Sequence, residues 1–470
     1  MKHDAPRQIV AAAVAREHSP HTKILLTSSI APTLLRMAWP NVLVMLAQAS
    51  TGLIETWWVS HLGSDALIGM AVVFPGFMMM QMLSAGAVGG GISSAVARAL
   101  GARRRDDADA LVIHAVVINL IFGLLASGLF LAFGRPLYHA MGAEGRSLEA
   151  AMAYSNVVFG GSVLVWLLNA LASVIRGTGN MLVPSLAVFG SIVLLIPLSP
   201  LLIFGLGPIP ALGIAGGGVA VVVTTALSAG FLGYYVASGR CLVAFKLARL
   251  RRDLSADILR VGAVGALISM QTSLTVLLTT AMVGATAGAD AVAGYGTGAR
   301  LEYLMIPLAF GFGGPLVAMV GTNVGAGQHQ RALRVALVGS GLVFGVTEII
   351  GIAAAIWPAA WLGLFGHDPR MIETGSLYLR IVGPAYGFFG VGLSLYFASQ
   401  GAGKLFWPLA SGFLRLVISI LGGWLALRAT GSLQWLFVAV ATGLVVYGTL
   451  LTTAIASGAW FRKSISTTMG

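Results

Sequence analysis

Long apolar stretches, separated by short loops, make up most of this 470-residue chain. Each stretch exceeds the roughly 20 mostly apolar residues that a helix needs to cross a bilayer. Gly, Pro and charged residues mark the ends of the stretches. We therefore predict an all-α polytopic membrane protein with 12 transmembrane helices. The predicted spans are 34–60, 66–99, 110–134, 151–175, 181–206, 213–239, 259–284, 291–324, 332–357, 373–399, 405–428 and 434–461.

Charged residues are scarce and unevenly placed. They make up only 9% of the chain, against roughly 25% in soluble proteins, so lipid is the expected solvent. The net charge of +12 could suit nucleic acid, but most Lys and Arg fall in alternate loops and the two tails. This positive-inside pattern predicts a multi-pass protein of the bacterial inner membrane, with both termini cytoplasmic and no nucleic-acid partner. The basic segments are 2–36, 98–105, 240–260, 331–334 and 462–463.

The two halves of the chain repeat each other at an offset of about 224 residues, which indicates a duplicated unit. Six spans in each unit is an even number, so the units are parallel repeats related by an axis along the membrane normal. In the turns 176–180 and 400–404, Gly is expected to supply a positive φ. The matched pairs include Gly101 with Gly325, Gly142 with Gly366, Tyr154 with Tyr378, Arg176 with Gln400, and Pro184 with Pro408.

The repeat also predicts how the chain is divided. The basic loop near 240–260 is the longest cytoplasmic connection and forms the natural boundary. The predicted parts are a cytoplasmic tail (1–33), an N-lobe (34–240), a cytoplasmic linker (241–258), a C-lobe (259–461) and a second tail (462–470). We expect a monomer with a cavity between the lobes.

Catalytic and metal-binding patterns are not visible in the sequence. The single Cys241 excludes an intramolecular disulfide, and the eight His are scattered without metal-ligand spacing. No nucleophile, base and oxyanion set can be assembled either. We therefore expect no enzyme activity, no cofactor and no metal.

Three acids fall deep inside apolar spans: Glu55, Glu302 and Glu348. Because an ionised carboxylate in hydrocarbon is costly, such groups tend to face a cavity and to be functional. An apolar surrounding also favours the protonated form of a carboxyl group, which a proton carrier needs. Glu348 has no accompanying polar stripe, so we expect it to meet a local or neighbouring hydrogen-bond partner instead.

Glu55 is the strongest candidate for a coupling group. Asn41, Gln48 and Thr51 precede it at spacings that place all four on one helix face, next to an N-lobe cavity. An interfacial Glu beside the aromatic belt of Trp57 and Trp58 is the alternative.

Other polar groups extend the candidate site in both lobes. Pro40 marks either a bend in the first span or simply the start of the helix. Asn169 in the N-lobe and Gln271 with Thr275 in the C-lobe could line a cavity or join helices. Arg300 and Glu302 are two residues apart, so each should meet a group from another helix rather than its neighbour. The intramembrane cation candidates are Arg300, Arg380 and Arg415.

The order of these motifs resembles the multidrug and toxic compound extrusion (MATE) family over about residues 34–460. The resemblance rests on Ala38-Trp39-Pro40, on Gly52-Leu-Ile-Glu55-Thr56 and on Ser93-Ser94-x3-Arg98-Ala-Leu-Gly101. Ala293-Gly-Tyr-Gly-x3-Arg300-Leu-Glu302 is most similar to its DinF-like branch. The resemblance implies a V-shaped two-lobe exporter of organic, cationic or amphiphilic compounds that is driven by protons or Na⁺.

For the ion, the resemblance implies that an acid on span 1 takes part in coupling, and here that position is Glu55. Two further family acids are missing, since Ser199 stands in a Leu-Ser-Pro context on span 5 and Gln271 stands on span 7. A Na⁺ site needs several oxygen ligands, so these departures favour protons over Na⁺.

Two other transporter classes share parts of the pattern. A major-facilitator transporter has the same repeat, but 101–106 lacks that family's loop motif. A lipid-linked oligosaccharide or lipid flippase of the related superfamily is the stronger alternative. Such flippases typically have more spans or a strongly cationic cavity.

Overall fold

The computed structural model describes residues 18–208, 210–246 and 249–461, and every regular element in them is a helix. The predicted cytoplasmic location of the termini concerns 1–17 and 462–470, which lie outside the described residues. The helices of the first half are α2 (Pro20–Thr27), α3 (Ile30–Ser60), α4 (Ser64–Gln81), the π-turn η1 (Met82–Val88), α5 (Gly89–Gly101), α6 (Arg105–Ala140), α7 (Gly145–Gly160), α8 (Ser162–Gly177), α9 (Leu182–Phe204) and α10 (Ile214–Ala237).

The second half repeats this order of helices, and it begins with one long helix. Gly288, at φ +81° and ψ −170°, interrupts that helix and divides it into two. The elements are α11 (Arg252–Gly325), α12 (His329–Ile356), α13 (Pro358–Leu362), α14 (Pro369–Val382), the 3₁₀ turn η2 (Gly383–Ala385), α15 (Tyr386–Ala402), α16 (Phe406–Val417), the π-turn η3 (Ile418–Gly422), α17 (Gly423–Thr430) and α18 (Leu433–Ala456).

The described helices are long and apolar enough for a multi-pass membrane protein. Ten helical stretches meet the length and hydropathy needed to span a bilayer, when α4 to α5, α14 to α15 and α16 to α17 each count as one. The bent pair α7 and α8 makes eleven. Counting α11 as one span on each side of Gly288 gives the predicted twelve. Large apolar side chains such as Leu124, Phe133 and Ile349 are exposed on these helices, as expected where lipid replaces water.

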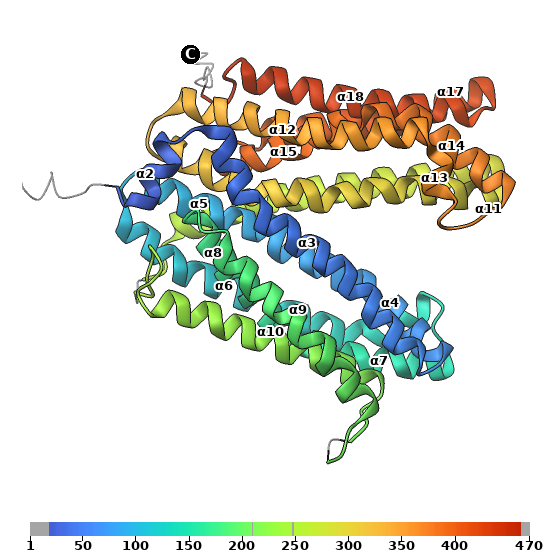
Figure 1. The fold of residues 1–470 in the computed structure, drawn as a ribbon, viewed down its shortest axis with the longest axis horizontal. Coiled ribbons are helices and arrows are strands. Elements are labelled where there is room, and N and C mark those ends of the chain that lie inside the picture. The colour runs from blue at the N-terminus through green and yellow to red at the C-terminus, as the bar shows by residue number, and fades with distance from the viewer. Residues whose placement is uncertain (1–17, 209, 247–248, 462–470) are drawn as a thin grey trace, which may run out of the picture.

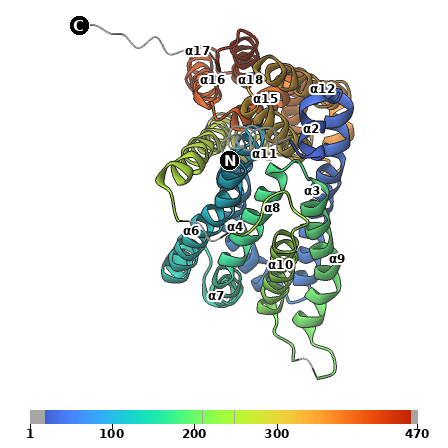
Figure 2. The same cartoon turned by 90° about the vertical axis from the view of Figure 1, so that its left-hand side faces the viewer.

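The helices form two lobes that meet at one end of the molecule and separate toward the other (Figure 1). The loops at 101–105, 238–246 with 249–251, and 326–328 share the end where the lobes meet, which we call the basic end. Figure 2, turned by 90°, shows the first-half helices α6 to α10 grouped apart from α12 and α15 to α18. The all-α, two-lobe fold expected from the sequence is therefore confirmed.

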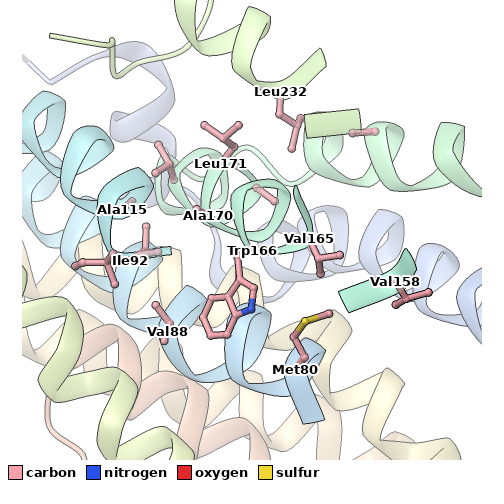
Figure 3. Close-up of a cluster of buried hydrophobic side chains, with 14 of the residues drawn as sticks. Met80, Val88, Ile92, Ala115, Val158, Val165, Trp166, Ala170, Leu171 and Leu232 are labelled. Atoms are coloured by element: carbon pink, nitrogen blue, oxygen red, sulfur yellow. The ribbon is translucent and has the colours of Figure 1, made fainter. Parts of the chain in front are cut away.

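Buried apolar side chains form a core in each lobe. In the N-lobe, Val88, Ile92, Trp166 and Leu171 pack among α5, α8 and their neighbours (Figure 3). A second core at the basic end joins Leu34 and Ala38 of α3 to side chains of α11, α12 and α15. The first turns of α3 therefore pack on second-half helices, although the sequence assigns 34–60 to the N-lobe, and α3 then crosses to the first half (Figure 1).

The predicted repeat reappears in two close contacts between helix backbones. A Cβ on Gly101 would lie 2.1 Å from the Thr322 carbonyl oxygen, and a Cβ on Gly325 would lie 2.2 Å from that of Arg98. Because both pairs are related by the 224-residue offset, the two contacts exchange under the internal symmetry. The turn glycines Gly179 and Gly403 also share a positive φ, of +88° and +68°, as their spacing predicts.

Polar contacts join the lobes at the basic end. Arg98 of α5 pairs with Asp257 of α11 at 2.7 Å and donates to the Gly401 carbonyl at 3.2 Å. Ser94 donates to the same carbonyl at 3.1 Å. These contacts hold the basic end closed.

The short helix α2 spans the same junction, within the segment predicted to be a tail. His18, just before α2, bonds to the Gly101 carbonyl at 3.0 Å. Asn323 and Arg331 donate to the carbonyls of Leu25 and Ser28, at 3.1 and 2.5 Å. Helix α2 therefore contacts both halves of the chain.

The linker after α10 is fastened to the start of α6. Asp109, which is 2% exposed at its side chain, accepts from the Ala244 amide at 2.9 Å and pairs with Lys246 at 2.7 Å. His114 accepts from the Arg251 amide at 2.8 Å. The hydrogen bond to Asp109 raises the pKa of Lys246.

Candidate functional site

Helix α3 carries most of the sequence-predicted N-lobe site. It begins at Ile30, ten residues before Pro40, so Pro40 lies inside a continuous helix. The helix-start interpretation of Pro40 is therefore wrong. A proline at such a position removes one backbone hydrogen bond and can bend a helix; its role as a bend stays a prediction.

Asn41 connects three helices. Its side-chain oxygen accepts from Ser185 of α9 at 2.9 Å, and its amide donates to the Gly311 carbonyl of α11 at 3.4 Å. The side chain is buried. Asn41 therefore links α3 to one helix of each half of the chain.

The other polar groups of the stripe lie further along α3. Gln48 is exposed. Thr51 is buried, and its hydroxyl donates to the Ala47 carbonyl at 2.8 Å. The stripe therefore does not act as one unit, because its members have separate partners.

Glu55 lies five residues before the end of α3, and this end of the helix lies opposite the basic end (Figure 1). It is half-buried and interacts electrostatically with Tyr154, a buried residue of α7. Within the described part of the chain, no Lys, Arg or His nitrogen lies within 4 Å of its carboxylate. Glu55 is thus an acid on α3 that no cation of the described chain neutralises.

Asn169 belongs to a separate polar cluster in the N-lobe. Its amide donates to the Gln81 side-chain oxygen at 2.9 Å and to the Ser84 hydroxyl at 2.8 Å. Ser84 belongs to the π-turn η1, where α4 passes into α5. Such a turn frequently marks a functional position in a helix. The spacing of polar residues in the sequence did not identify Gln81 or Ser84 as site residues.

In the C-lobe, Glu302 accepts a hydrogen bond from the hydroxyl of Tyr378 on α14. Tyr378 is the repeat partner of Tyr154, which interacts electrostatically with Glu55. In each lobe the repeat-related tyrosine therefore interacts with a carboxylate from a different helix, although only Tyr378 forms a hydrogen bond to its acid. The two acids do not occupy equivalent positions, and this parallel appears only in three dimensions.

Arg300 and Glu302 have different partners, as expected. The Arg300 guanidinium lies 5.5 Å from the Phe365 ring centre, and the side chain is exposed. Glu348 accepts from the Gly387 amide at 2.7 Å. That amide is one of the unpaired donors at the start of α15, after the 3₁₀ break η2, so Glu348 caps an interrupted helix of the neighbouring span.

Gln271 and Thr275 line a small internal space together with Arg415 of α16. The Thr275 hydroxyl donates to the Gln271 carbonyl at 2.8 Å. The Gln271 amide has only a long contact, at 3.4 Å, to the Leu409 carbonyl. Among the described residues, no group of three or more His, Cys, Asp or Glu could hold a metal ion.

Known proteins similar to this chain agree on one fold. A FAD transporter of Shewanella oneidensis is 28% identical over 400 residues, which cover 84% of this chain and 88% of the relative. The probable multidrug resistance protein NorM of Thermotoga maritima is 25% identical over 466 residues, covering 92% and 94%.

Solved structures show the same two-lobe arrangement. A MATE crystal structure in the bent conformation has a TM-score of 0.86 at 23% identity, covering 94% of this chain and 99% of that one. The straight conformation gives 0.85, so these scores do not distinguish the two conformations. The MatE family model matches residues 40–201 and 266–425. With more than half of its length matched in both repeats, the chain belongs to the MATE family of membrane transporters.

Proposed function

We propose that this protein is a secondary active exporter of small organic compounds that works as a monomer in antiport with protons. Glu55 is the principal coupling carboxylate. The observation that carries this proposal is its placement: a half-buried acid on the helix that passes from one lobe to the other, with no cation within 4 Å among the described residues. The DinF-like branch and the cytoplasmic termini in the bacterial inner membrane remain predictions.

The cycle follows from the position of Glu55 on α3. The lobes touch at the basic end and separate at the other, where α3 ends five residues after Glu55 (Figure 1). A proton taken up there removes the charge between α3 and α7. The helix then bends near Pro40 and displaces the bound compound outward. Release of the proton toward the basic side resets the carrier.

Protons are favoured over Na⁺ by the ligand count. A Na⁺ site needs several oxygen ligands, whereas Glu55 has Tyr154 as its polar neighbour from another helix. Ser199, at the position where the family often has an acid, is buried with an unpaired hydroxyl. A single carboxylate suits a proton better than a metal cation.

The compounds exported are of one of two classes. The multidrug relatives support cationic or amphiphilic compounds. The FAD transporter of Shewanella oneidensis supports a flavin nucleotide, and the buried Arg415 in the C-lobe favours this second candidate because it offers a positive charge to an acidic group.

The test is efflux from proteoliposomes under an imposed pH gradient, with a Na⁺ gradient as the second arm. Glu55→Gln keeps the shape but cannot cycle a proton, so gradient-driven efflux should be abolished while the protein still purifies as a folded monomer. Glu55→Asp should retain partial activity. Glu348→Gln is the matched control, since it alters another intramembrane acid. Efflux by Glu55→Gln at the wild-type rate would refute the mechanism.

A further inference from the structure

Arg415 is an arginine enclosed in the C-lobe. It is only 6% exposed and lies in the last turn of α16, three residues before the π-turn η3 begins. The aromatic rings of Phe389 and Tyr447 lie over its guanidinium, with ring centres 5.3 and 5.8 Å from the central carbon. This packing fixes the charged group in place but uses none of its N–H donors.

The donors of Arg415 lack acceptors. Its Nε is buried without a hydrogen-bond partner, and no acceptor within the described ranges bonds to its other nitrogens. Glu302 is close enough to interact electrostatically, but it forms no ion pair within 4 Å and its carboxylate accepts from Tyr378 instead. A buried charge without hydrogen bonds is costly, so an acceptor from outside the protein should complete this site.

The space beside Arg415 sets the size of that acceptor. Gln271, Thr272, Gly412 and Tyr447 line it with Arg415, and it encloses about 10 Å³. This is room for about one water molecule or one oxygen atom. Gln271, Thr272 and Gly412 are partly exposed, so a larger molecule can insert a single oxygen while the rest of it stays outside the lobe.

We propose that Arg415 is a substrate-binding residue that takes an oxygen of an acidic group, a carboxylate or a phosphate, on the exported compound. This inference rests on the proposed export function and names its substrate class. A guanidinium suits such an oxygen because hydrogen bonds between ionised groups are roughly twice as strong as neutral ones. Lys would offer only a point charge there.

Gln271 adapts the site to this ligand. Its side-chain oxygen is buried without a partner, and its amide nitrogen has only the 3.4 Å contact to Leu409. A half-turn of the amide therefore loses little and presents its NH₂ to the same oxygen. Gln271 and Arg415 then both donate to the ligand.

Binding of two dyes to the purified full-length protein, without any gradient, tests the proposal. Fluorescein is anionic and rhodamine 123 is cationic, and they share one ring system. Arg415→Gln should weaken fluorescein binding about 10- to 150-fold, as expected when one hydrogen bond to a charged group is lost. Rhodamine 123 should bind as in wild type, and Arg415→Lys should be intermediate. Because no transport is measured, failure of proton coupling at Glu55 would not affect the result.

A second variant covers the case in which Arg415→Gln does not fold. A Cβ on Gly412 would lie 2.6 Å from the Gln271 side-chain oxygen, so Gly412→Ala should push Gln271 into the site and weaken fluorescein binding while keeping the charge. Gly422→Ala is the control, because its Cβ meets nothing closer than 3.9 Å.

Three results would overturn the proposal. The first is equal fluorescein affinity in wild type and in every Arg415 and Gly412 variant that folds. The second is an equal loss for both dyes, which would mean a structural role. The third is chloride alone stabilising wild type but not Arg415→Gln, with fluorescein binding unchanged, since the acceptor would then be an inorganic ion.

Discussion

Replacing Gly101 by Ala should open the basic end of the transporter. The added Cβ would lie 2.1 Å from the carbonyl oxygen of Thr322 and 2.8 Å from its carbonyl carbon. Since favourable contacts need about 3.5 Å or more, the two helices must move apart by roughly 1 Å. Neither can yield by a side-chain rotation, because both contacts are to backbone atoms.

The expected magnitude follows from the cost of overpacking, about 1–3 kcal/mol. That cost applies only while the lobes touch, so it favours the state in which the basic ends separate. At 1.4 kcal/mol for each tenfold change, the ratio of the two states shifts by about 5- to 150-fold. Ala also forms helix better than Gly by about 1 kcal/mol, but this gain is the same in both states.

Distances between spin labels measure the shift. Labels at Arg105 and Gln328, exposed on the two loops at the basic end, would be placed in a Cys241→Ser background. Gly101→Ala should add a longer-distance population, and Gly325→Ala should reproduce it, because its Cβ meets the Arg98 carbonyl oxygen at 2.2 Å.

Gly128→Ala is the matched control, since a Cβ there meets nothing within 4 Å. It should leave the distances unchanged. If Gly101→Ala and Gly325→Ala both give the wild-type distance distribution, the contact between these helices does not hold the basic end closed.

Three smaller effects follow from other contacts. Asp257→Asn should change the ratio of the two states by less than about fivefold, because Asp257 is 47% exposed and exposed ion pairs contribute about 0–1 kcal/mol; a larger change would contradict this ranking. Glu348→Leu should lower thermal stability by about 1–3 kcal/mol by leaving the Gly387 amide unpaired, whereas Glu348→Gln, which keeps an acceptor, should lose less. Asp109→Ala should speed hydrogen exchange in 241–246, because Asp109 pairs with Lys246 at 2.7 Å. Asp106→Asn should not, because Asp106 lies 3.8 Å from Lys246. Since Asp109 raises the pKa of Lys246, this anchoring is complete below the ordinary lysine range and is lost only as the pH rises through the raised value.

The sequence by itself determined the membrane class, the spans and the repeat. Apolar length and scarce charge leave little choice of solvent, because an unpaired backbone group in lipid is too costly for any structure but a helix or a closed barrel. Glycines recur in both halves at the same offset of about 224 residues, because a side chain would not fit their backbone conformations and close contacts. The same reasoning identified Glu55 and Glu302 as acids that need an explanation.

Only the tertiary structure decided which polar groups meet. The spacing of the polar residues on α3 predicts one surface, yet Asn41 bonds to α9 and α11 while Glu55 interacts electrostatically with Tyr154 of α7. Likewise, the neighbours of Arg415 come from α11, α15 and α18, residues far apart in the chain. Periodicity fixes the face of a helix on which a residue lies. The partner facing it depends on how helices distant in sequence pack, and no local pattern encodes that packing.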